Sequence, residues 1–263
     1  MSLFANKAQA TDAISVTVPT FSLGEVVFNT LRSIGKTLYQ AYRKVHDIIW
    51  RIVKRIFDLV FSGTMLVLLL PVFMIVAIAI KLDDHGPIFF RQTRTGRHGK
   101  TFKIMKFRTC SIDNDVHDAK SADTHTKVGN FLRKTSIDEL PQLWNIFKGE
   151  MSFVGPRPWI TDYYDNMTES QRGRTEVRPG MTGLAQVMGR NAISIFDKIG
   201  YDLEYVGHFG LRADVKVFTL TFKQFISKSD GSAVDAGKST IHGELEQLKL
   251  QRQDWKNTFF ISK

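Results

Sequence analysis

The sequence has little cysteine and lacks two common nucleotide-binding patterns. Cys110 is the single cysteine among 263 residues, which excludes an internal disulfide and a multi-cysteine metal site. No G-x-G-x-x-G turn is present, so a dinucleotide-binding Rossmann unit is not expected. The segment GSAVDAGKST at 231–240 has five residues between its glycines, where a P-loop needs four, so a P-loop is not expected either.

Negative charge is also scarce. The chain has 36 Lys and Arg against 26 Asp and Glu, a net charge of +10. This excess favours an anionic partner, such as nucleic acid, a phosphorylated small molecule or an acidic membrane face. The hydrophobic content of 43% is ordinary for a globular protein and argues against a polytopic membrane protein.

One long apolar run is present at residues 59–80, and it contains no charged residue. A straight helix of that length would cross a bilayer, so a single span is one interpretation. Two features favour another: Pro71 lies within the run, and basic residues outnumber acidic ones five to two at 41–58 and eight to two at 81–108. We therefore expect a re-entrant, monotopic anchor that bends near Pro71 and returns to the face it entered from.

Upstream of this run, apolar residues recur at alternating steps of four and three, which predicts an amphipathic helix. They are Val27, Leu31, Ile34, Leu38, Ala41, Val45, Ile48 and Ile52. The spacing also fits a coiled coil. Because the stripe leads directly into the apolar run, a helix lying in the headgroup region is favoured. Residues 1–20 show no period and are expected to be a disordered leader.

Two β-prone runs flank TGRHGK at 95–100 and predict a hairpin over residues 87–108. Its basic residues alternate with phenylalanines, a composition that suits stacking on nucleic-acid bases or contact with a membrane surface.

The segment KTSIDELPQLWNIFK at 134–148 holds the adjacent carboxylates Asp138 and Glu139. Ser136 and Glu139 match the S-x-x-E capping box, which predicts a helix start, and Gly149 predicts its end. The same pair of carboxylates also suits a reaction centre, and these residues alone leave both interpretations open.

Two Gly/Pro-rich turns carry arginines. In SFVGPRPW at 152–159 the prolines fix the backbone around Arg157, whose free guanidinium suits a phosphate, although a purely structural turn fits as well. RPGMTGLAQVMGRN at 178–191 repeats the pattern with Arg178 and Arg190.

Several segments, in this order, resemble the bacterial sugar transferases, also called monotopic phosphoglycosyl transferases, over residues 51–226. They are KRIFD, GPIFFRQTRTG, FKIMKFRT, LRKTSIDELPQLWN, GEMSFVGPRP, RPGMTGLAQVMGR and DLEYV. The resemblance implies transfer of a phospho-sugar from a UDP-sugar to polyprenyl (undecaprenyl) phosphate, with release of UMP. Such a reaction initiates polysaccharide or glycoconjugate assembly.

The resemblance also implies the roles of individual residues. Asp138 matches the nucleophile that forms a covalent phospho-sugar intermediate, and Glu139 matches its Mg²⁺-associated partner. Other positions associated with substrate binding are Lys106, Arg133, Arg157, Arg190 and Asp214. Two departures are Leu70 before Pro71, where the family often has Ser, and VGHFGLRADV, which lacks the Asn and Ser often found before the later Asp.

The expected fold is a helix-rich α+β monotopic membrane enzyme with interfacial amphipathic helices and one small β-hairpin. It would lie on the cytoplasmic face of the bacterial inner membrane and contact its lipids. The expected parts are a leader (1–20), an interfacial helix (21–57), a re-entrant hairpin (58–81), a catalytic domain (82–228) and a linker with a tail helix (229–263). The rival interpretation is a non-catalytic, membrane-tethered protein that binds nucleic acid or anionic lipid.

Overall fold

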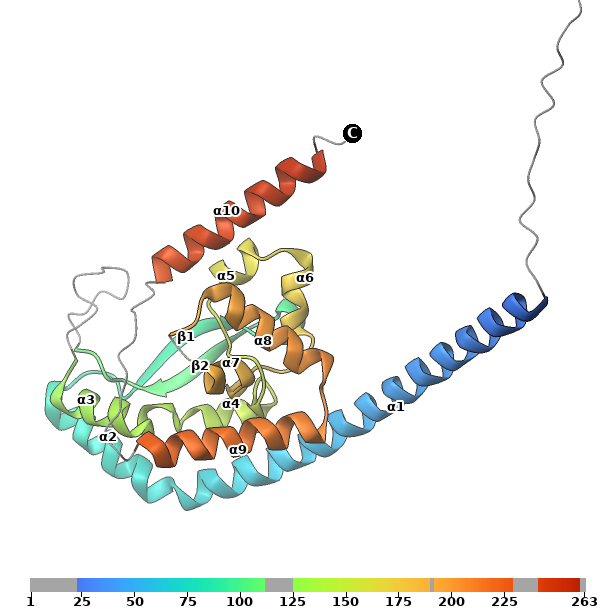
Figure 1. The fold of residues 1–263 in the computed structure, drawn as a ribbon. Helices are drawn as coiled ribbons and strands as arrows, with labels where there is room; N and C mark the ends of the chain where they lie inside the picture. The colour runs from blue at the N-terminus through green and yellow to red at the C-terminus, as the bar shows by residue number, and fades with distance from the viewer. Residues whose placement is uncertain (1–22, 112–124, 190–191, 229–240, 261–263) are drawn as a thin grey trace, which may run out of the picture. The chain divides into compact units, whose positions relative to one another are not determined.

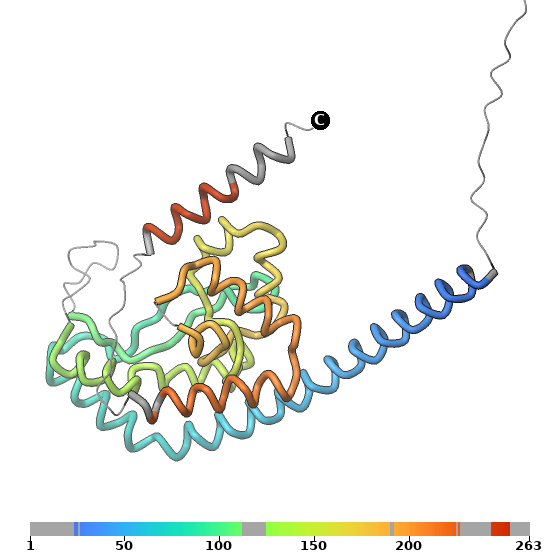
Figure 2. The backbone as a smooth tube through the Cα atoms, viewed as in Figure 1, coloured from blue at the N-terminus to red at the C-terminus, as the bar shows by residue number. Residues whose placement is uncertain are grey.

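The computed structural model describes residues 23–111, 125–189, 192–228 and 241–260 (Figures 1 and 2). The predictions for the leader, for the segment GSAVDAGKST and for Arg190 fall outside these residues. The chain divides into two units, Met1–His46 and Asp47–Lys263, and each is described by itself.

The described part of the first unit is the beginning of helix α1 (Leu23–Leu68). The predicted apolar stripe lies on this helix, and its side chains are exposed, among them Val27, Leu31 and Leu38. The helix continues without a break past residue 57, where the interfacial helix was expected to end.

In the second unit, α1 is followed by α2 (Leu70–Asp84) after a break at Leu69, and the two helices are bent by 59°. Pro71 lies in the first turn of α2, where backbone N–H groups have no partner within the helix, so proline is tolerated there. Among the described residues, no single helix is long and apolar enough to cross a membrane, whereas the bent pair together meets that criterion by length and composition.

The predicted hairpin is confirmed. Strands β1 (Phe89–Thr95) and β2 (Thr101–Phe107) pair antiparallel, with Phe89 opposite Phe107 and Thr95 opposite Thr101. The connecting turn holds two residues with positive φ, His98 and Gly99.

A second small sheet was not predicted. It consists of β3 (Ser152–Val154) and β4 (Gly180–Thr182), which pair in parallel. Strands of three residues are too short to show an alternating pattern in sequence. A side chain at Gly180 would approach the Gly155 nitrogen to 2.1 Å, so this contact between the two turns requires glycine.

Helices make up most of the rest of the unit, so the prediction of a helix-rich α+β fold is confirmed. They are α3 (Lys127–Thr135), α4 (Gln142–Lys148), α5 (Thr161–Asn166), α6 (Glu169–Arg172), α7 (Leu184–Met188), α8 (Ile195–Gly207), α9 (Leu211–Lys228) and α10 (Ile241–Phe260), with single 3₁₀ turns at Arg97–Gly99, Ile137–Glu139 and Gly173–Thr175.

The buried side chains explain where these elements meet. Phe102 and Ile104 of β2 pack against Leu143 and Ile146 of α4. Nearby, Val76 and Ile80 of α2 pack against Phe107 of β2 and Leu132 of α3. The short turn Ile137–Glu139 therefore lies where the hairpin, α3 and α4 come together (Figure 1).

The predicted tail helix is present as α10, and it packs on α5 (Figure 1). Leu248 is buried among Trp159, Tyr163 and Ile199. Glu244 accepts a hydrogen bond from Tyr163 and pairs with Lys198 at 2.6 Å.

Candidate active site

Asp138 and Glu139 lie in a single 3₁₀ turn, Ile137–Glu139, between α3 and α4. The predicted capping box is wrong. Ser136 has a φ of 60°, in the left-handed region, and its side chain makes no capping hydrogen bond. An N-cap residue needs an extended backbone to bring its oxygen to the next N–H groups, whereas Ser136 ends α3 instead. Helix α4 begins only at Gln142, and Gly149 ends it as predicted.

The hairpin brings Lys106 to this turn. Lys106 Nζ lies 2.6 Å from Glu139 Oε1. Asn145 of α4 holds β2 in register, because its Oδ1 accepts from the Met105 N–H at 3.0 Å and its Nδ2 donates to the Lys103 carbonyl at 2.8 Å. The amide thus ties the strand just before Lys106, on both sides of Ile104, to the helix that follows the carboxylates.

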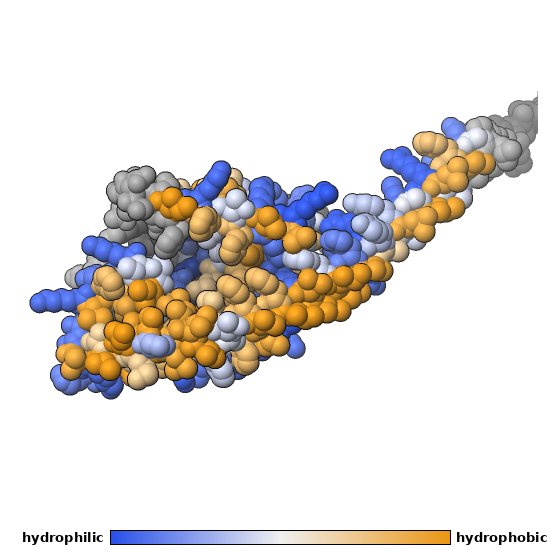
Figure 3. Space-filling model, turned by 90° about the horizontal axis from the view of Figure 1, so that it is seen from below, coloured by the Kyte–Doolittle hydropathy of each residue, from blue (hydrophilic) through white to orange (hydrophobic). Residues whose placement is uncertain are grey.

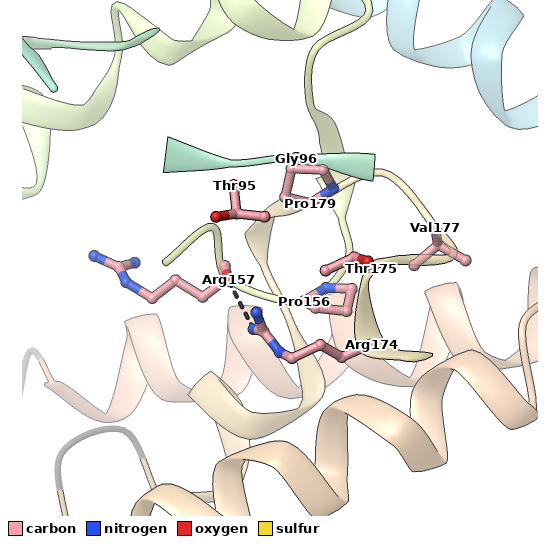
Figure 4. A pocket seen from close by; sticks show the side chains of 8 residues that line it. All are labelled: Thr95, Gly96, Pro156, Arg157, Arg174, Thr175, Val177 and Pro179. Atoms are coloured by element: carbon pink, nitrogen blue, oxygen red, sulfur yellow. Dashed lines mark hydrogen bonds between the residues drawn. The ribbon is translucent and has the colours of Figure 1, made fainter. Parts of the chain in front are cut away.

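A second cation comes from the loop after β3. Arg157 is exposed, and its Nη2 lies 3.4 Å from Glu139 Oε1. The loop backbone is fixed by Arg174, which is only 3% exposed and donates to the Arg157 carbonyl at 2.8 Å (Figure 4). Arg174 is itself held by Asp202 at 2.6 Å and lies 3.9 Å from the centre of the Trp159 ring. The backbone of Arg157 is therefore held in place, while its guanidinium group is exposed next to Glu139.

A small cavity lies behind this loop, between Thr95, Pro156 and Arg174 (Figure 4). Its volume of about 10 Å³ is the space of about one water molecule. The buried hydroxyl of Thr95 has no partner within the described part of the chain, and a water in the cavity would satisfy it. The cavity therefore belongs to the loop's packing and is too small for a nucleotide.

The two carboxyl groups have different electrostatic surroundings. Burial raises the pKa of the Asp138 carboxyl; Glu139 adds to the rise, whereas Lys106 and Arg133 oppose it. Burial alone would also raise the pKa of Glu139, but Arg157 and Lys106 outweigh it and hold that pKa at about 2. Glu139 is therefore a fixed negative charge between two cations, while Asp138 is more easily protonated. Pairs of neighbouring acids whose pKa values are pushed apart are typical of reaction centres.

Arg133 of α3 lies on the Asp138 side. Its side chain is exposed, its Nη1 is 2.9 Å from His125 Nε2, and its charge acts on Asp138. The structure thus brings Lys106, Arg133 and Arg157 to the carboxylates, whereas Arg190 lies outside the described residues.

Asp214 lies in a different network. Its carboxylate accepts from Lys54 Nζ at 2.6 Å, from Trp50 Nε1 at 3.2 Å and from the Tyr205 hydroxyl. These contacts hold α9 and α8 against α1, and they do not include the carboxylate pair.

The charged residues just before the apolar run have a structural role that was not predicted. Arg55 donates to the carbonyls of Ile146 and Phe147 at 2.8 Å each, at the end of α4. Asp58, 1% exposed, accepts from Ser152 Oγ at 3.1 Å and from a backbone N–H of β3. The signal was the three-to-four spacing of Lys54, Arg55 and Asp58, which puts them on one side of α1.

Most of the chain matches a known protein family. Residues 49–228 match the family described as bacterial sugar transferase. The chain belongs to this family, so the predicted family and its transferase class are confirmed.

Individual relatives agree with the family. The chain is 45% identical to the uncharacterized sugar transferase EpsL of Bacillus subtilis, over 56% of this chain and 74% of the relative. Two others are named UDP-glucose:undecaprenyl-phosphate glucose-1-phosphate transferase. The Escherichia coli one is 42% identical over 65% of this chain, and the Caulobacter vibrioides one is 40% identical over 63%. The chain covers only 40% of the Escherichia coli relative but 67% of the Caulobacter one.

Proposed function

We propose that this protein transfers a phospho-sugar from a UDP-sugar to a polyprenyl phosphate, such as undecaprenyl phosphate, and releases UMP. The observation that carries the proposal is the pair Asp138 and Glu139, one carboxyl with a raised pKa beside one held ionised by Lys106 and Arg157. A protein that only bound anions would gain nothing from two carboxylates at the centre of its cations, and this disfavours the nucleic-acid-binding alternative.

The reaction divides into two displacements at one phosphorus. In the first, an oxygen of the Asp138 carboxylate forms a bond to the sugar-bearing phosphorus, and the bond between the two phosphates breaks. The electron pair of the broken bond leaves with UMP. In the second, an oxygen of the polyprenyl phosphate attacks the same phosphorus and frees the Asp138 carboxylate. Covalent catalysis of this kind splits a difficult exchange into two easier steps.

The cations neutralise the phosphate charges that would otherwise repel an attacking carboxylate. Lys106 and Arg133 act on Asp138, and Arg157 presents its guanidinium from a fixed loop. Arg190 was predicted to join them, and this stays a prediction. Substrate binding by Asp214 also stays a prediction, although its buried contacts favour a structural role.

Magnesium fits the residues present. Mg²⁺ sites of phosphoryl-transfer enzymes use one or two carboxylates together with substrate phosphates. Among the described residues no cluster of three or more candidate ligands occurs, so Glu139, ionised and next to Asp138, would hold the ion with the diphosphate. The ion would supply additional charge neutralisation during transfer.

A re-entrant anchor on the cytoplasmic face of the inner membrane would bring this site to a lipid acceptor. The entry to the apolar run is tied to the domain by Arg55 and Asp58. The exit is tied to it by Asp84, which pairs with Arg108, and by Asp83, which accepts from the Val128 N–H. Both ends of the apolar run are thus tied to the same domain. A straight span would place these two ends on opposite sides of the membrane, which does not fit the contacts.

The apolar surface supports the same arrangement. Seen from below, the domain presents a broad hydrophobic face along α2, the end of α1 and α9 (Figure 3). On α9 the exposed apolar residues form one stripe, namely Leu211, Val215, Phe218, Phe222 and Ile226. A stripe of this kind suits a helix lying in the membrane interface.

Topology can be tested by cysteine labelling in a Cys110→Ser background. Lys36→Cys and Lys100→Cys lie before and after the apolar run, and we expect a membrane-impermeant maleimide to label both only after spheroplasts are opened. Labelling of Lys36→Cys in intact spheroplasts would contradict the re-entrant anchor.

Activity is tested with the full chain in vesicles that contain polyprenyl phosphate, Mg²⁺ and a panel of UDP-sugars, beginning with the UDP-glucose of the relatives' names. We expect one donor to give UMP and a lipid-linked sugar diphosphate in equal amounts. If no donor yields a lipid product, the proposed function fails.

A further inference from the structure

Arg94 is a cation that the site described so far does not use. It lies on β1 opposite Phe102, while Phe90 of β1 lies opposite Lys106. Side chains two and four residues apart on a strand project from the same face, so Arg94 and Lys106 share one face of the hairpin. They stand about 13 Å apart along the strands, since each residue advances roughly 3.3 Å.

The hydrogen bonds of Arg94 are incomplete within the described part of the chain. Its Nη2 donates to Gln92 Oε1 at 2.5 Å, whereas its Nε is buried without a partner. Burial and the charge of Arg157 lower the pKa of Arg94 to about 10, with Tyr163 and Glu139 acting in the opposite direction. An unpaired buried donor beside a second guanidinium is costly, and an anion shared by both would satisfy them.

The balance of charge around the pair of carboxylates points to the same kind of ligand. Four cations act on Asp138 and Glu139, namely Lys106, Arg133, Arg157 and Arg94, and they leave a surplus of two positive charges. Guanidinium groups bind phosphate oxygens through paired N–H donors. A diphosphate is therefore the ligand whose charge and shape fit.

The arginines divide between the two carboxylates, whereas Lys106 acts on both. Arg133 acts on Asp138, the proposed nucleophile, while Arg157 and Arg94 act on Glu139. The Thr95 N–H, next to Arg94 in the strand, donates to the Trp159 carbonyl at 2.8 Å, so Arg94 lies beside the loop that carries Arg157. A phosphate there would be the one that departs when Asp138 attacks its neighbour.

We propose that Arg94 binds the nucleotide phosphate of the donor and, together with Arg157, takes up the charge that this phosphate gains as it leaves. The inference rests on the proposed function, because it assigns the leaving group of that reaction. When the bond between the two phosphates breaks, the electron pair remains on an oxygen of the nucleoside monophosphate, and Arg94 stabilises it.

The test compares Arg94→Gln and Arg94→Lys with Arg91→Gln. Arg91 is an exposed arginine on the same strand, on the opposite face, and serves as the matched control. Two quantities are measured on the purified full chain: the affinity for UMP by calorimetric titration, and KM and kcat for the UDP-sugar in the vesicle assay. Thermal unfolding establishes that each variant is folded.

For Arg94→Gln we expect about a tenfold or larger loss of UMP affinity and a similar rise in KM, since a hydrogen-bonded charge is removed. Arg94→Lys should recover part of both, and Arg91→Gln should stay within about twofold of wild type. UMP affinity unchanged in a folded Arg94→Gln protein would overturn the inference.

Failure of the inference can be told apart from failure of the proposed function. If the wild type forms no lipid product from any donor, the proposed function fails, yet the UMP titration still decides whether Arg94 binds a nucleotide phosphate. If the wild type does not bind UMP at all, the inference is wrong.

Discussion

Lys106 Nζ lies 2.6 Å from Glu139 Oε1, and the same ammonium lowers the pKa of the neighbouring Asp138 carboxyl. One lysine therefore serves both members of the pair: it keeps Glu139 ionised and opposes the effect of burial on Asp138. This relationship has a measurable consequence for the pH dependence of the first step.

Replacement of Lys106 by methionine should shift the acid limb of the rate profile to higher pH. The ammonium lowers the pKa of Asp138, so its removal raises that pKa, and as the proposed nucleophile Asp138 must be ionised to attack. We expect UMP release at neutral pH to fall about tenfold or more. The check is UMP release as a function of pH, with Lys103→Met as control, because Lys103 is exposed on the opposite face of β2. An unmoved acid limb in Lys106→Met would show that Asp138 does not govern it.

Asn145→Ala should lower the free energy of unfolding more than a surface substitution does. Asn145 is 2% exposed, and its loss leaves the Met105 N–H and the Lys103 carbonyl without their partner. We expect the free energy of unfolding to drop by about 2–3 kcal/mol. Urea unfolding of the detergent-solubilised protein measures it, and Asn130→Ala on the exposed side of α3 is the control. Equal stabilities of the two variants would be the contrary result.

Arg174→Met should destabilise by about 3–5 kcal/mol, since it leaves Asp202 buried without its cation. It also removes the donor to the Arg157 carbonyl, so KM for the donor should rise. The double variant Arg174→Met, Asp202→Leu should regain part of the lost stability, because the uncompensated charge is gone. A double variant less stable than Arg174→Met would mean that packing, not charge, dominates.

We predict that helix α10 contributes to the stability of the domain, although it lies beyond the residues matched by the family. Leu248 is 1% exposed, so Leu248→Ala should cost about 2–4 kcal/mol. Leu250, two residues along the helix, is 63% exposed, and Leu250→Ala should leave the unfolding midpoint almost unchanged. Thermal unfolding of both proteins distinguishes a docked helix from a loosely attached one, for which the two substitutions would have the same effect.

The elements that the sequence predicted well are those with local signals. The hairpin follows from turn residues between β-prone runs, and the long amphipathic helix follows from its repeat. Lys106 and Arg157 were placed at the site by resemblance, and the structure brings both to Glu139.

The errors come from contacts between distant residues, which local patterns do not contain. The S-x-x-E pattern at Ser136 is genuine, but Ser136 ends α3 in a left-handed conformation and does not cap a new helix. Asp58 and Asp214 form hydrogen bonds with residues about a hundred or more positions away in the sequence. Their structural roles could therefore not be predicted from the residues next to them in the chain. The unpaired Nε of Arg94 likewise became visible only in three dimensions.

The most direct measurement is the intact mass of the purified full chain after incubation with Mg²⁺ and the active UDP-sugar, without lipid acceptor. The account predicts an adduct with the mass of one sugar phosphate, UMP in an equal amount, and loss of both in a folded Asp138→Asn protein. Transfer to polyprenyl phosphate with no adduct on the wild type, or an adduct that persists in Asp138→Asn, would contradict the assignment of Asp138 as the nucleophile.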